Sequence, residues 1–234
     1  MTIKAIIFDF DGTIVRFNID YMAVRSEARS LLINHGLPAS ILQLNDSIFD
    51  MLEKAEIYLT NNRRREKVIK DVQHAVRAIA EKYELEAAKS TSLVPHAVFT
   101  LKKLKGMHLK IGLCTVNSQR TTSFLIKRFG IAQYFNTIVS RDQVKRVKPN
   151  IEHLQATLKS LGVDKVEAIL VGDGVRDMEC AKELEVIAVG MPTGVSSKEE
   201  LITSGANYIA TSLAELPKLV VHVNLLLKGL SPSL

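Results

Sequence analysis

Apolar residues in this chain gather in short runs that alternate with amphipathic stretches, most clearly after residue 90. Runs of three to six apolar-rich residues predict strands, and these are 109–114, 137–139, 166–171, 186–189 and the shorter 208–209. Helical periodicity predicts helices over 118–129, 151–161 and 176–184. Strands that alternate with amphipathic helices are typical of a parallel sheet covered on both faces. We therefore expect an α/β fold.

One more apolar run stands near the N-terminus and ends in two acidic residues. Ile6, Ile7 and Phe8 lead into Asp9, Phe10, Asp11, Gly12 and Thr13. Residues two apart in a strand point to the same side, so Asp9 and Asp11 are expected to converge. Two close carboxylates repel unless a cation lies between them or one keeps its proton. The pattern indicates a divalent metal site or a nucleophile beside a general acid. The alternative is a polar strand end followed by an Asp-Gly turn.

Two other predicted strands also stop at residues that suit phosphate or metal binding. Thr115 follows the run 109–114, and Asp173 follows the run 166–171 after Gly172. Ligands of parallel α/β sheets gather at the carboxyl ends of the strands. We therefore expect Asp9, Asp11, Thr115 and Asp173 to meet at one edge of the sheet.

Residues 16 to 90 interrupt this alternation with a pattern that is almost entirely helical. Val68, Val72, Val76, Ile79 and Tyr83 recur at steps of three and four, which predicts one amphipathic helix. Earlier helices are expected around 22–32 and over 39–60. We interpret 16–90 as a helical insert, with 1–15 and 91–234 forming the core. An insert at a strand's carboxyl end is placed to act as a lid over a site, although these helices could instead simply extend the core.

Composition and charge narrow the function classes. The 234 residues carry a net charge of +6, which mildly favours anionic partners such as phosphorylated metabolites or nucleic acid. The basic run 61–67 is interpreted as a solvated helix end, so no nucleic acid is expected. No signal-peptide pattern and no apolar stretch of about 18 to 20 residues is present, which predicts a cytoplasmic protein without membrane contact. The apolar segment 219–227 is expected to dock on the chain's own sheet or on a second subunit, giving a monomer or a homodimer.

Four motifs in a fixed order then carry a resemblance to a known family. They are Asp9 to Thr13, Leu113-Cys114-Thr115, Lys148-Pro149, and Gly172-Asp173 with Asp177. In this order, and with a helical insert between the first and second, they resemble the haloacid dehalogenase superfamily over nearly the whole chain. The stretch 171–178, with 205–208 and 213–216 after it, looks most like the phosphoglycolate phosphatase-like branch. The resemblance implies a Rossmann-like parallel sheet core with helices on both faces and an inserted helical cap of the C1 type.

The resemblance also implies catalytic roles for four residues. Asp9 would attack the phosphorus atom of the substrate and form an aspartyl-phosphate intermediate. Asp11 would protonate the leaving alcohol and then deprotonate the attacking water. Thr115 would donate its hydroxyl proton to the phosphoryl group. Lys148 would neutralise the phosphoryl oxygens and restrain Asp9.

A magnesium ion and a small phosphorylated substrate complete the implied site. Mg²⁺ would be held by Asp9, the backbone carbonyl of Asp11, Asp173 and, through a water, Asp177, since magnesium prefers oxygen ligands and retains waters. Four further residues are candidates for binding the substrate, namely Gly12, Thr13, Arg16 and Asn117.

Departures from the family pattern and other function classes qualify this interpretation. The stretch 14–18 replaces the usual residues at the cap entry, which leaves the substrate open, and Glu185 stands where a glycine often ends the helix. The leading prediction is a Mg²⁺-dependent phosphatase of small metabolites, and the alternative is a sugar phosphomutase, which returns the phosphoryl group to its substrate. A signalling receiver domain would also combine clustered aspartates, a threonine and a lysine. A catalytically silent phosphosugar sensor is a further alternative.

Overall fold

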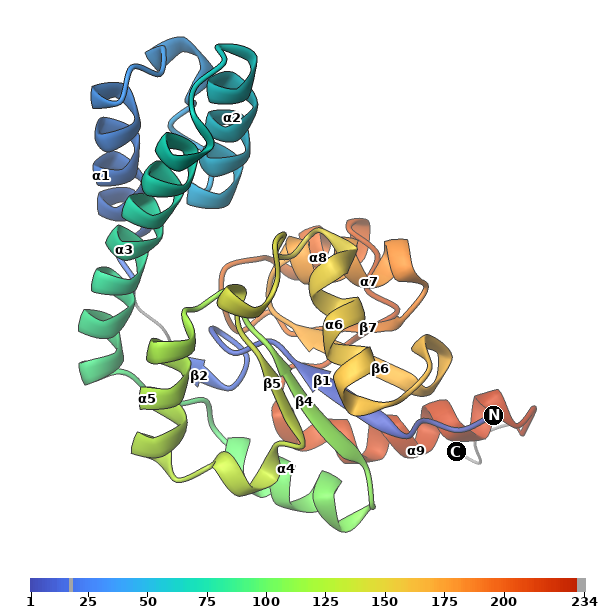
Figure 1. Ribbon diagram of the computed structural model, residues 1–234. Helices are drawn as coiled ribbons and strands as arrows, with labels where there is room; N and C mark the ends of the chain where they lie inside the picture. Colours follow the sequence, from blue (N-terminus) through green and yellow to red (C-terminus); the bar gives the residue numbers. More distant parts are fainter. Residues whose placement is uncertain (17–18, 231–234) are drawn as a thin grey trace. The chain divides into compact units, whose positions relative to one another are not determined.

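A computed structural model describes residues 1–16 and 19–230 of the chain (Figure 1). The chain forms two compact units, one of Met1–Phe17 with Thr91–Leu234 and one of Asn18–Ser90. Within the described residues of the first unit, six strands form one sheet in the order β5-β4-β1-β6-β7-β8, and every neighbouring pair is parallel. The strands are β1 (Ala5–Phe8), β4 (Lys110–Cys114), β5 (Thr137–Val139), β6 (Ala168–Gly172), β7 (Ile187–Gly190) and β8 (Tyr208–Ile209).

Helices cover both faces of this sheet, as the alternation of strands and helices predicts. Helices α6 and α7 pack on one face, against β4 and β5 and against β6 and β7, while α4 and α9 pack together on the other (Figure 1). The helices of this unit are α4 (Ala97–Gly106), α5 (Gln119–Phe129), α6 (Ile151–Leu161), α7 (Val175–Leu184), α8 (Lys198–Thr203) and α9 (Leu216–Leu227). The expected α/β sheet fold is confirmed.

The register of the central strands decides which residues meet at the sheet edge. Phe8 of β1 lies beside Leu113 of β4 on one side and Val171 of β6 on the other. Asp9, Cys114 and Gly172, the next residues along, are therefore level with one another. All four residues of β1 are fully buried, so apolar packing on both faces fixes this register.

Local turns and caps decide where two elements of this unit begin and end. The strand expected over 166–171 begins only at Ala168, because Lys165–Glu167 form a 3-10 turn that Asp164 caps by accepting the Val166 N–H at 3.2 Å. Helix α7 ends at Leu184, as expected, and Glu185 after it adopts a left-handed conformation with φ of 59°. The short antiparallel ribbon of β2 (Val15–Arg16) and β3 (Ser92–Leu93), together with α4 and α8, was not predicted.

The C-terminal apolar segment forms α9 and docks on its own unit. Val220 and Val223 are buried, and the side chain of Asn224 accepts a hydrogen bond from the Ile3 N–H at 2.6 Å. Within the described part of the chain, no helix is both long and apolar enough to cross a membrane. Further short 3-10 segments of this unit lie at Ala132–Tyr134, Arg141–Gln143 and Leu213–Glu215.

The second unit is helical. Helices α1 (Tyr21–Asn34), α2 (Ile48–Asn61) and α3 (Glu66–Ser90) pack around an apolar core that includes Leu32, Met51 and Val76. The single helix expected over 39–60 was wrong, because Ala39–Ile41 form only a 3-10 turn and α2 begins after Ser47, whose side chain and that of Asp50 cap it reciprocally. In α3, Val68 is 36% exposed, so the apolar stripe begins at Ile69 instead.

Candidate active site

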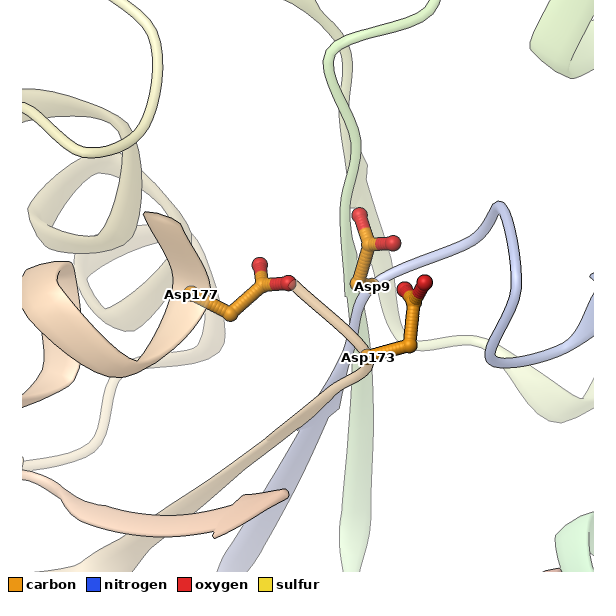
Figure 2. A group of neighbouring side chains, drawn as sticks. All are labelled: Asp9, Asp173 and Asp177. Carbon is orange, nitrogen blue, oxygen red and sulfur yellow. The ribbon is translucent and has the colours of Figure 1, made fainter. Parts of the chain in front are cut away.

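Three acidic side chains converge at the carboxyl edge of the sheet. Asp9 directly follows β1, Asp173 directly follows β6, and Asp177 lies in the first turn of α7 (Figure 2). One carboxylate oxygen from each lies within 4.8 Å of those of the other two, and all three residues are buried. The backbone N–H of Asp9 donates to Val171 O at 2.8 Å, which holds the end of β1 against β6. The sheet register thus brings residues 164 positions apart in the sequence into one cluster.

Lys148 supplies positive charge inside this cluster. Its Nζ atom donates to Asp9 Oδ1 at 2.7 Å, to Asp177 Oδ1 at 2.5 Å and to the Cys114 carbonyl at 2.7 Å. The residue is only 2% exposed, so all three ammonium protons are satisfied by protein acceptors. Burial alone would lower its pKa, but Asp177 and Asp9 outweigh this and raise the pKa of Lys148 well above its ordinary value.

The single lysine does not balance the acidic groups. Burial raises the pKa of Asp9 to about 8, with further contributions from Asp177 and Asp173 and opposed by Lys148. Burial and Asp177 likewise raise the pKa of Asp173 to about 6. Three buried carboxylates against one ammonium leave an excess of negative charge, which a cation would relieve. The all-oxygen donor set of Asp9, Asp173 and Asp177 therefore fits a hard divalent ion such as Mg²⁺.

Asp173 is held by the turn after β1 and by the loop after β7. Its Oδ2 accepts from the Val195 N–H at 3.0 Å, and its Oδ1 accepts from the Thr13 hydroxyl at 3.3 Å. Gly12 adopts a φ of 74°, and a Cβ atom added there would lie 2.2 Å from Asp173 Oδ2. Gly12 is thus required for two reasons, a left-handed backbone and the close approach of Asp173. Thr13, a predicted substrate-binding residue, is buried, and its hydroxyl contacts Asp173.

The loop after β4 brings Thr115, Asn117 and Asp11 together. Thr115 is fully buried, and its hydroxyl oxygen accepts from the Asn117 N–H at 3.2 Å. The Asn117 side-chain amide donates to Asp11 Oδ1 at 2.8 Å. Asp11 is half-buried, unlike Asp9, so it stands at the more accessible side of the site.

Arg16 is the predicted site residue that the structure keeps apart from this cluster. It lies in β2, its side chain is exposed, and its strand pairs with Ser92 of β3. Among the described residues it forms no hydrogen bond or ion pair with the acidic cluster. Two of the residues that follow it, 17 and 18, lie outside the described part of the chain.

Several residues that position the site were not identified from the sequence. The Thr193 hydroxyl donates to the Gly12 carbonyl at 2.8 Å, and buried Arg141 donates from Nη1 to the Val116 carbonyl at 3.1 Å. Both act on the backbone of site loops, and such contacts leave no motif in a single sequence. The turn-forming run Pro192-Thr193-Gly194 directly after a strand was the available signal for the first.

Comparisons with known proteins show which chains this one is similar to. A phosphoglycolate phosphatase from Photorhabdus laumondii is 26% identical over 220 residues, covering 92% of this chain and 91% of that protein. The pyrophosphatase PpaX of Bacillus pumilus is 24% identical over 225 residues, covering 94% and 97%. The crystal structure of a hydrolase from Pseudomonas syringae shares the fold, with a TM-score of 0.64 and 20% identity over 95% of this chain and 99% of that one.

The family itself follows from a match to a family model. Residues 6–191 match the model of the haloacid dehalogenase-like hydrolases. This stretch contains all four motifs and runs from β1 to the end of β7. The chain therefore belongs to the haloacid dehalogenase-like hydrolase family.

Proposed function

We propose that this protein is a Mg²⁺-dependent phosphatase of small phosphorylated metabolites that works through an aspartyl-phosphate on Asp9. The observation that carries the proposal is the pairing of Asp9 with buried Lys148 inside an acidic cluster at the sheet edge. The names of the relatives, a phosphoglycolate phosphatase and a pyrophosphatase, support phosphoryl chemistry. Membership of a hydrolase family argues against the receiver-domain alternative.

The geometry suggests how the first half of the reaction proceeds. Lys148 holds Asp9 Oδ1, which leaves Oδ2 as the atom that attacks phosphorus. The new bond forms between Oδ2 and phosphorus while the bond from phosphorus to the alcohol oxygen breaks. Asp11 gives its proton to that oxygen, so the alcohol leaves neutral. Thr115, at the end of the neighbouring strand β4, would donate a hydrogen bond to the transferring group.

The second half returns the enzyme to its starting state. A water attacks phosphorus, its proton passes to Asp11, and the bond between phosphorus and Asp9 Oδ2 breaks to release inorganic phosphate. Asp9, Asp173 and Asp177, with the Asp11 carbonyl, would hold Mg²⁺, which when bound neutralises the crowded carboxylates and the phosphoryl oxygens. Lys148 neutralises the remaining charge on Asp9 in both halves.

We assign the helical unit, Asn18–Ser90, to the role of a cap that controls access and selects the substrate. Its place in the sequence, between β1 with its acidic motif and the rest of the sheet, supports this role. Such inserts are a common way to exclude water from a reacting phosphoryl group.

The test is phosphate release from a panel of esters, with Mg²⁺ and with EDTA. The panel contains phosphoglycolate, sugar phosphates, nucleotides, pyrophosphate and an aryl phosphate. Asp9→Asn is the inactive variant, and Glu179→Gln is its control, a carboxylate-to-amide change on the exposed face of α7. Release that needs Mg²⁺ and disappears in Asp9→Asn alone supports the proposal. Isomerisation of a sugar phosphate without release would favour a phosphomutase, and binding without turnover would favour a sensor.

A further inference from the structure

We propose that Asn117 is the positioning residue of Asp11, rather than a substrate contact; this inference rests on the proposed function. The Asn117 Nδ2 atom donates to Asp11 Oδ1 at 2.8 Å, across 106 positions of sequence. Asn117 is 2% exposed, whereas Asp11 is half-buried. A buried donor therefore fixes one oxygen of the Asp11 carboxyl group.

The backbone of Asn117 is itself held in place from both sides. Its N–H donates to the Thr115 hydroxyl oxygen at 3.2 Å, and its carbonyl accepts from the Arg141 N–H at 3.2 Å. The adjoining loop is tied to the same 3-10 turn, because Gln119 N–H donates to Asp142 Oδ2 at 2.7 Å and Arg141 Nη1 donates to the Val116 carbonyl at 3.1 Å. This network leaves the side-chain amide of Asn117 little freedom to turn away from Asp11.

An amide suits a residue that transfers a proton in both directions. A lysine or arginine beside Asp11 would favour its ionised form throughout and would oppose its action as an acid. The Asn117 amide carries no charge, so it can donate to Oδ1 whether or not the other oxygen of Asp11 carries a proton. A general acid must also lie within hydrogen-bond reach of the leaving oxygen, and a misplacement of about 1 Å costs about a hundredfold in rate.

The inference makes a prediction that depends on the leaving group. An alkoxide is a poor leaving group, so an alkyl ester needs the proton from Asp11. The 4-nitrophenolate anion is a good leaving group and departs readily without that proton. Asn117→Ala should therefore lower kcat/KM about tenfold or more for the best alkyl phosphate of the panel and change kcat/KM for 4-nitrophenyl phosphate by about twofold or less, because kcat/KM reports the first half of the reaction, up to the departure of the alcohol. The second half, in which Asp11 takes a proton from water, is common to both esters, so kcat should fall for both.

A double-mutant cycle shows whether Asn117 acts through Asp11. Asn117→Ala added to Asp11→Ala should cause no further loss on the alkyl ester, since the group it positions is already gone. Asn117→Ser serves as a second variant, because its hydroxyl is too short to reach Asp11 and it keeps a small polar side chain in the loop. Melting temperatures of all variants are compared with that of the wild type.

Other outcomes would overturn the proposal in distinguishable ways. Equal losses of kcat/KM on both esters would make Asn117 a structural or phosphate-binding residue. No loss on either ester would remove it from the mechanism. A further loss in the Asp11→Ala background would show that it acts elsewhere. A wild-type protein that releases phosphate from neither ester would instead contradict the proposed function itself.

Discussion

Replacing Lys148 by methionine removes the positive charge of the site while keeping a side chain of similar length. Lys148 is 2% exposed and bonds two carboxylates, Asp9 at 2.7 Å and Asp177 at 2.5 Å. Removing one partner of a buried ion pair costs about 3 to 5 kcal/mol, because the remaining charge stays buried without compensation. For a chain of this size, that corresponds to a fall in melting temperature of roughly 6 to 20 °C.

The assay is thermal unfolding in EDTA, with Lys145→Met as the matched control. Lys145 lies three residues away in the same loop, but its side chain is exposed, so its replacement should change the melting temperature little. The loss in Lys148→Met should shrink toward acidic pH, because burial raises the pKa of Asp9 to about 8 and a protonated carboxyl needs no counter-charge. Added Mg²⁺ should recover part of the stability.

Activity gives a second measurement of the same change. Without Lys148, negative charge that develops on the phosphoryl oxygens loses a stabilising partner. The effect should resemble removal of an oxyanion donor, about 10² to 10³ in kcat. A variant that melts at the wild-type temperature in EDTA and turns over at the wild-type rate would refute the reasoning, because it would show that Lys148 neither compensates the carboxylates nor acts on the substrate.

Three further predictions concern pH, backbone and capping. In the metal-free protein, burial raises the pKa of Asp9 to about 8 and that of Asp173 to about 6, above the values near 4 of an unfolded chain. Between about pH 4 and about pH 8 the folded state therefore binds more protons than the unfolded state, so the free energy of unfolding should fall as pH rises. The fall is at most about 1.4 kcal/mol per pH unit for each group. Urea unfolding in EDTA at several pH values checks this, and a rise in stability would contradict it. Gly12→Ala should lower kcat about a hundredfold or more, because the added Cβ would displace Asp173. Gly130 also has a positive φ, 61°, but open space surrounds the position of an added Cβ, so Gly130→Ala should only destabilise the protein, by about 1 kcal/mol. Equal activities of the two variants would contradict the close approach of Asp173 to Gly12. Glu185→Gly should raise the free energy of unfolding, measured in urea, by about 0.5 to 1 kcal/mol, because φ is 59° at this position. A destabilised variant would show that the contacts of the Glu185 side chain outweigh the strain of its left-handed backbone.

The parallel sheet was predictable because its central strands are buried on both faces. Such strands appear as continuous apolar runs, as in β1 and β6, whose residues are all buried. The edge strands, which are less buried, were also predicted, and 137–139 and 208–209 have the bounds of β5 and β8. Helix 151–161 was equally clear, since Gly162 adopts the left-handed conformation that ends it. Elements held by local capping were less visible. The 3-10 turn at Lys165–Glu167 contains the apolar residue Val166 just before the apolar run of β6, so the strand was predicted to begin two residues too early.

The site was predictable as a set of strand ends, but not as a network of contacts. Asp9 and Asp173 follow from their positions at the ends of predicted strands, and Lys148 follows from the resemblance to the family's ordered motifs. The partner of Asn117 does not, because its hydrogen bond to Asp11 depends on a loop that Arg141 holds through the backbone. Long-range contacts between a side chain and a backbone carbonyl have no periodicity and no fixed spacing, and only the folded chain reveals them.

The central claim is that Asp9 carries the phosphoryl group during turnover. The direct measurement mixes the protein with a hydrolysed ester and Mg²⁺, quenches the reaction in acid within its first turnover, and maps phosphorylation by peptide mass spectrometry. The account predicts one phosphoryl group on the peptide that contains Asp9, absent in Asp9→Asn and in EDTA. Phosphorylation of another residue, or wild-type turnover by Asp9→Asn, would contradict it.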